Sequence, residues 1–63
     1  MPVITIDIGI VESREKKVEL VKALTAAAST ATQIPIERFI VHINELERDN
    51  IGIGGLLLSD ILK

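Results

Sequence analysis

Pro2 has the most distinctive chemistry in this sequence, because it directly follows Met1. An initiator methionine is normally removed when the second residue is small, and the product would begin with a free secondary amine. An α-amino group titrates at about pH 8, closer to neutrality than a lysine side chain. A general base works best when its pKa lies near the operating pH, so this amine suits proton transfer at a carbon acid. Met-Pro alone is a common start, so the prediction that Pro2 is catalytic depends on the rest of the chain.

Two other features have a simpler structural interpretation. The GIGG segment at 52–55 lacks the Lys-Ser/Thr end of a phosphate-binding loop and the strand-to-helix context of a dinucleotide site, so it predicts a turn with positive φ. His42 lies among apolar residues of a predicted strand, where a histidine is more often a buried or interface residue than a catalyst. One histidine and no cysteine do not make a metal site. We therefore expect no metal site.

A strand and a long helix must position Pro2. In residues 3–8 (VITIDI) three isoleucines alternate with Thr5 and Asp7, which predicts a strand with one strongly apolar face. After a connection over 9–12, Ser13 is a suitable N-cap, and leucine and alanine residues recur at helical spacing. The sequence predicts a helix over 13–32 that ends before Pro35, because a residue preceding proline avoids the helical conformation.

The second half of the chain predicts another strand and a glycine-rich end. Residues 36–38 form a turn, and residues 39–45 (FIVHINE) alternate between two faces of a second strand. A polar loop over 46–50 then leads to a tight hairpin or bulge at the glycines of 52–55. Because the two main strands are joined by a long helix, they should be parallel with a right-handed crossover.

The size and composition predict a subunit that needs partners. The chain has 63 residues, which indicates a single domain over 1–63. It is 48% hydrophobic and has no cysteine, yet a domain of this size buries only about 60% of the surface that its unfolded chain exposes. Two strands and one helix are not a complete domain. The expected fold class is α+β: a β-α-β subunit with a short C-terminal hairpin, which dimerises into a four-stranded sheet with two helices.

Composition also argues against several classes of protein. The formal net charge is −2 and there is no basic block, so a nucleic-acid partner is not expected. The apolar runs are far shorter than the roughly 20 residues that span a bilayer. The first ten residues, MPVITIDIGI, lack the basic start of a signal peptide. We therefore expect a cytoplasmic protein with no membrane partner.

The whole chain resembles the 4-oxalocrotonate tautomerase family of the tautomerase superfamily. It shares Met-Pro before an aliphatic strand, a helix that opens near Ser13 with EKKVELV, a proline before FIVHINE, and NIGIGG followed by an apolar tail ending in SD. These motifs are loose individually, but their joint occurrence in register is specific. The resemblance implies a cofactor-free tautomerase whose amino-terminal proline is a general base on a small enol or keto acid. It also implies a hexamer built from three dimers.

The family's catalytic proline carries over to Pro2, but its other functional residues do not. The family binds the carboxylate and carbonyl oxygens of its substrate with two arginines, and a phenylalanine keeps the proline pKa low. In ungapped register these three positions hold Glu12, Ile40 and Ile51. Ile51 would keep an apolar wall without an aromatic ring. Ile40 would occupy the position of the second arginine.

Two displaced arginines are candidates to bind the substrate. Arg14 lies two residues after Glu12, and Arg38 lies two residues before Ile40, about 6.6 Å along what would be the same strand face. Glu12 has the opposite effect, because a carboxylate near the Pro2 amine would raise the pKa of that amine. The protonated amine would be a general acid and a poor base.

Three functions therefore remain open at the level of sequence. The leading hypothesis is a tautomerase that acts through Pro2 on a small enolisable keto acid. A second is another reaction that depends on Pro2, of the hydratase, dehalogenase or decarboxylase type. A third is a homologue that has lost catalysis and has a structural role.

Overall fold

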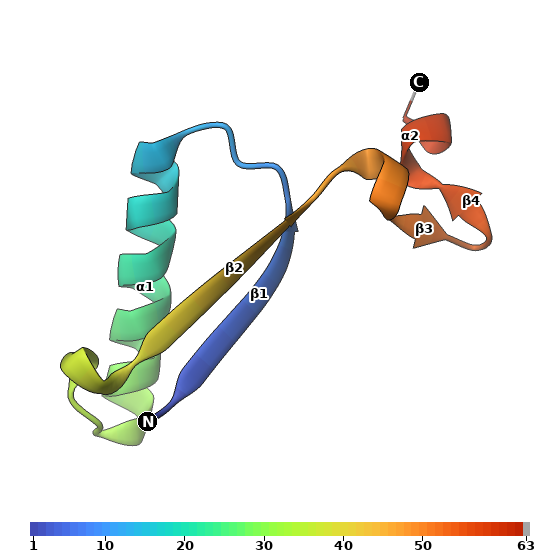
Figure 1. Cartoon of the computed structure of the whole chain (residues 1–63). Helices are drawn as coiled ribbons and strands as arrows, with labels where there is room; N and C mark the ends of the chain where they lie inside the picture. Colours follow the sequence, from blue (N-terminus) through green and yellow to red (C-terminus); the bar gives the residue numbers. More distant parts are fainter. Residues whose placement is uncertain (63) are drawn as a thin grey trace.

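The computed structural model describes residues 1–62 and consists of a β-α-β body with a projecting C-terminal arm (Figure 1). The body contains β1 (Val3–Gly9), α1 (Arg14–Thr32), the 3-10 turn η1 (Ile36–Arg38) and β2 (Ile40–Leu46). The arm contains the 3-10 turn η2 (Arg48–Asn50), β3 (Gly52–Ile53), β4 (Leu56–Leu57) and the short α2 (Leu58–Ile61). The principal extents of 43 × 25 × 15 Å reflect the projecting arm.

The two long strands form the parallel pair that the sequence predicts. β1 and β2 pair in register from Val3–Ile40 to Gly9–Leu46, and α1 makes the crossover between them. Half-buried and exposed residues alternate along both strands, because α1 covers one face of the pair and leaves the other open (Figure 1). Ile4, Ile6 and Ile8 are the half-buried set of β1, as their period of two predicts.

Specific caps define the ends of α1. At the start, the Ser13 side-chain oxygen accepts a hydrogen bond from the Lys16 backbone N–H at 3.3 Å. At the end, Gln33 adopts a left-handed conformation with φ of 64°, and its N–H donates to the Ser29 carbonyl at 2.8 Å. The predicted helix is confirmed, and it stops at a left-handed cap ahead of Pro35.

The second strand begins one residue later than the sequence predicts. Phe39 closes η1, because its N–H donates to the Ile36 carbonyl at 3.2 Å instead of joining the strand ladder. The ladder starts when the Ile40 N–H donates to the Pro2 carbonyl at 3.0 Å. Arg38 therefore lies in η1, and the prediction that it shares a strand face with Ile40 is wrong.

The glycine-rich segment forms the predicted hairpin. β3 and β4 are antiparallel, with Gly52 opposite Leu57 and Ile53 opposite Leu56. The two residues of the turn, Gly54 and Gly55, have φ angles of 61° and 86°, which side chains with a Cβ rarely adopt.

Residues 1–62 of a single chain form no fully buried hydrophobic core. None of the residues 1–62 is fully buried, and several large apolar side chains of the arm are about half exposed or more, such as Ile53 at 57% and Leu56 at 59%. Others on the body are Val3, Ile10, Ile36 and Ile40. Exposed apolar side chains in this number are typical of surfaces that contact other protein chains.

Candidate active site

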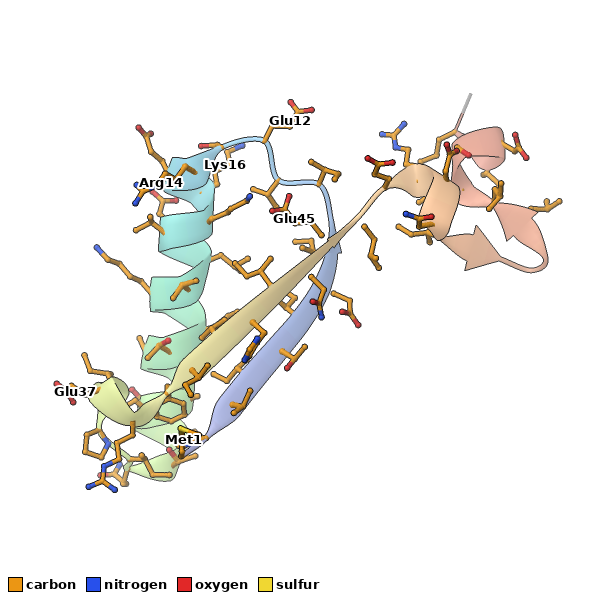
Figure 2. All side chains as sticks on the ribbon, viewed as in Figure 1. Met1, Glu12, Arg14, Lys16, Glu37 and Glu45 are labelled. Atoms are coloured by element: carbon orange, nitrogen blue, oxygen red, sulfur yellow. The ribbon has the colours of Figure 1, made fainter. Side chains whose placement is uncertain are left out.

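Pro2 lies at one end of the sheet, immediately before β1 and beside the start of β2. Its carbonyl oxygen accepts the first hydrogen bond of the ladder from Ile40, at 3.0 Å, so these two predicted site residues are neighbours. Arg38, two residues before Ile40, belongs to the same end of the molecule. In the chain with Met1 attached, the Pro2 nitrogen is part of a peptide bond. Met1 is 88% exposed at this end of the sheet (Figure 2).

The other predicted site residues lie at the opposite end of the same subunit. Glu12 and Arg14 lie around the start of α1, far from Met1 (Figure 2). The seven residues of β1 separate the two ends by about 20 Å at roughly 3.3 Å per residue. Ile51 follows η2 in the arm. Within one chain, Glu12 is therefore too far from Pro2 to change the pKa of its amine.

A cavity of about 610 Å³ lies between the connection after β1, the end of β2 and the arm. It brings together Glu12 and Ile51, which are far apart in the sequence. Its other apolar lining comes from Ile10, Leu46, Leu58 and Leu62. A cavity of this size and lining fits a small organic molecule.

Arg14 does not contribute to this cavity. It lines a separate hollow on the surface of α1 together with Lys17, Val18, Val21 and Lys22. The structure therefore does not bring Arg14 to either Pro2 or Glu12, although only one residue separates Arg14 from Glu12 in the sequence. The helix start turns the two side chains toward different surfaces.

Arg48 lines the cavity, and the sequence interpretation missed it. It begins η2, and the N–H of Ile51 donates to the Arg48 carbonyl at 3.3 Å. Ile51 follows this turn in an extended conformation and lines the same cavity. No pattern in the sequence pointed to Arg48, because its place beside the cavity depends on how the arm folds.

The cavity also carries three carboxylates, from Glu12, Glu47 and Asp49. Among residues 1–62, neither these side chains nor the Arg48 guanidinium form an ion pair or a side-chain hydrogen bond. The charged side chains of the cavity therefore do not pair with one another. Within the same residues, no group of three or more histidine, aspartate or glutamate side chains could hold a metal ion.

Glu45 holds the connection that carries Glu12. One carboxylate oxygen accepts a hydrogen bond from the Val11 N–H at 3.0 Å, and the other forms an ion pair with Lys17 of α1. The hydrogen bond from Lys17, followed by that from the Val11 backbone, lowers the pKa of the Glu45 carboxyl. A side chain at the end of β2 thereby links the connection and the first turns of α1 to the sheet.

His42 lies on the face of the sheet that α1 leaves open. It pairs with Thr5, and the next pair on this face is joined by a hydrogen bond from the Asn44 amide to an Asp7 oxygen at 2.9 Å. His42 is exposed in the subunit and lines none of the cavities described above. Its interpretation as an interface residue remains a prediction.

Comparison with known proteins identifies the class to which this subunit belongs. A family model described as "Tautomerase enzyme" matches residues 2–61. A probable tautomerase of Lactiplantibacillus plantarum is 37% identical over 60 residues, which cover 95% of this chain and 94% of the relative. The chain therefore belongs to the tautomerase family.

Solved structures agree with this assignment and with the fold. A 4-oxalocrotonate tautomerase homologue is 38% identical, with a TM-score of 0.84 over 95% of each chain. A heterohexameric 4-oxalocrotonate tautomerase from Chloroflexus aurantiacus is 30% identical, with a TM-score of 0.88 over 97% of this chain and 98% of that chain. The resemblance stated from sequence and the predicted β-α-β subunit are both confirmed. No helix among residues 1–62 is long and apolar enough to cross a membrane.

Proposed function

We propose that this protein is a cofactor-independent tautomerase in which the Pro2 amine transfers a proton on a small enolisable keto acid. The observation that carries the proposal is the position of Pro2, which lies immediately before β1 in a chain that matches the tautomerase family from residue 2 onward. The amine removes the hydroxyl proton of the enol acid and delivers a proton to a carbon, which gives the keto acid. No atom is gained or lost, so the reaction needs no redox partner.

The reaction requires that Pro2 be the amino-terminal residue. With Met1 attached, the proline nitrogen is an amide without useful basicity, whereas the free secondary amine titrates at about pH 8. The 88% exposure of Met1 leaves it accessible to an aminopeptidase. We therefore propose that the mature chain starts at Pro2.

The complete site is assembled from more than one subunit. Pro2 and the cavity lie at opposite ends of a strand that spans about 20 Å. When two strands pair antiparallel, the start of one lies beside the end of the other. A second copy paired along β1 would therefore bring its Pro2 to the cavity of the first. We propose a homo-oligomer, a hexamer of three dimers, in line with the heterohexameric relative.

A second candidate function is favoured by the acidic side chains of the cavity. If Glu12 of one subunit lies near Pro2 of another, its carboxylate raises the pKa of the amine and favours the ammonium form. A protonated proline suits a hydration, dehalogenation or decarboxylation of an unsaturated acid. The pKa of the amine decides between the two functions: a value near 7 supports a general base, and a value above 9 supports a general acid.

A blocked amino terminus tests the proposed function. A variant with one extra leucine between Met1 and Pro2 keeps the proline nitrogen in a peptide bond. General-base catalysis contributes about 10²–10⁴-fold, so turnover of an enolpyruvate-type acid should fall by that factor while the oligomer persists. Intact mass should show that the unmodified chain lacks Met1.

Pro2→Ala is the matched control, because it retains a free amine and should lose only part of the activity. If the blocked variant keeps full turnover, Pro2 is not the base. If the intact unmodified oligomer turns over no enol acid, the third hypothesis, a homologue without catalysis, is supported instead.

A further inference from the structure

Arg48 has the position and surroundings of a ligand-binding arginine. Among residues 1–62 it is the one basic side chain that lines the 610 Å³ cavity. Its guanidinium forms no ion pair with any of these residues, although Glu12, Glu47 and Asp49 line the same cavity. A charged side chain that is left unpaired beside an apolar cavity is available to a charged ligand.

Two hydrogen bonds hold the backbone around Arg48. The Asn50 N–H donates to the Glu47 carbonyl at 2.8 Å and closes η2, and the Leu58 N–H donates to the Ile51 carbonyl at 2.8 Å. The second bond ties the residue after η2 to the start of α2. A fixed backbone lowers the cost of placing the side chain for binding.

We infer that Arg48 binds the carboxylate of the substrate in this cavity, and that the neighbouring acidic side chains restrict the cavity to ligands with a single carboxylate. That the ligand is the substrate of a reaction rests on the proposed function. That Arg48 binds a carboxylate is argued from the geometry of the cavity alone. A planar guanidinium offers two parallel N–H donors to one carboxylate. Ile51 and Leu58 provide an apolar surface for the carbon chain of the ligand.

The three carboxylates of the cavity determine what the far end of the ligand can carry. They are unpaired within residues 1–62, so they repel a second carboxylate and tolerate a neutral or amino group. The favoured ligand class is a 2-keto or enol monocarboxylate with an uncharged or cationic remainder.

Arg48→Ala tests the inference by two separate readouts. The first is binding of pyruvate, a simple keto monocarboxylate, followed by NMR titration; the dissociation constant should rise roughly 10- to 100-fold, the loss expected for a charged hydrogen bond or pair. The second is turnover of an enol acid and of its methyl ester. The acid should lose kcat/KM by a similar factor, mainly through KM, and the ester should be unaffected.

Lys22→Ala is the control, because it removes one positive charge from the surface of α1 outside this cavity. Arg48→Lys should recover part of the binding, since it keeps the charge without the fork of donors. Unchanged pyruvate binding in Arg48→Ala, or equal losses for acid and ester, would overturn the inference. If the unmodified protein binds pyruvate through Arg48 but turns over no enol acid, the proposed function fails and this inference survives.

Discussion

The two ends of the β1–β2 sheet carry different chemical groups. At one end, Pro2 lies beside Ile40 and the exposed Met1, and it lines none of the cavities described above. At the other end, a cavity combines apolar walls with Arg48 and three carboxylates. If Pro2 is the proton-transfer group, as proposed, one subunit separates it from the cavity that would bind the substrate. On this proposal, assembly is a condition for activity as well as for burying apolar side chains.

Removing one carboxylate from the cavity tests whether this end of the sheet selects the ligand by charge. Removing one unit charge from the neighbourhood of a second ligand carboxylate changes the interaction by about 1–2 kcal/mol in a partly hydrated site. Glu12→Gln should therefore raise kcat/KM for a dicarboxylate enol relative to a monocarboxylate by roughly 5- to 30-fold.

The same variant reports whether the two ends meet. If Glu12 of one copy faces Pro2 of another, Glu12→Gln lowers the pKa of the Pro2 amine, which an NMR titration measures. Glu19→Gln is the control, since it removes an exposed carboxylate on α1 outside the cavity. A selectivity that stays constant in Glu12→Gln would contradict the proposed role of the acidic side chains.

A smaller effect is expected from the link that holds the cavity end in place. The pKa of Glu45 is lowered in the folded chain, so its ionised form stabilises the fold at a pH above the ordinary value of 4.5. This contribution is lost as the pH falls through the lower, folded pKa. On acidification from pH 6 to pH 3.5, the Tm of the unmodified protein should therefore fall more than that of Glu45→Gln.

NMR spectra of the Glu45→Gln variant test the same link by a second measurement. Glutamine can still accept the hydrogen bond from Val11, but it cannot form the ion pair with Lys17. NMR signals of residues 9–12 should shift in this variant. An equal dependence of Tm on pH in both proteins would show that the Lys17–Glu45 pair does not stabilise the fold.

The sequence predicted those parts of the fold that depend on local patterns. The alternating isoleucines of β1, the Ser13 cap of α1 and the paired glycines of the hairpin each act within a few residues, so the pattern was sufficient. The start of β2 was misplaced by one residue, because Phe39 has strand character but closes a 3-10 turn. Whether the strand starts at Phe39 or at Ile40 depends on the hydrogen bond between Ile40 and Pro2, which are distant in sequence.

The site was less predictable for the same reason. Arg38 was assigned to a strand face that begins only at Ile40. Arg14 was a candidate to bind the substrate, but it lines a different surface from Glu12. Arg48 and Glu45 were missed, since the position of Arg48 beside the cavity and the contacts of Glu45 involve residues more than 25 positions away. Pro2 stood out because its chemistry depends on its position in the chain alone.

Mixed oligomers test most directly the claim that one subunit's Pro2 works with the cavity of another. The two parents are the leucine-extended variant, with a blocked Pro2, and Arg48→Ala, each with little activity. If the two groups belong to different chains, random mixing creates some sites with an intact Pro2 and an intact Arg48. The mixture should recover about one quarter of the activity of the unmodified protein. If the mixture shows only the average of its parents, both groups act from the same chain and the account is contradicted.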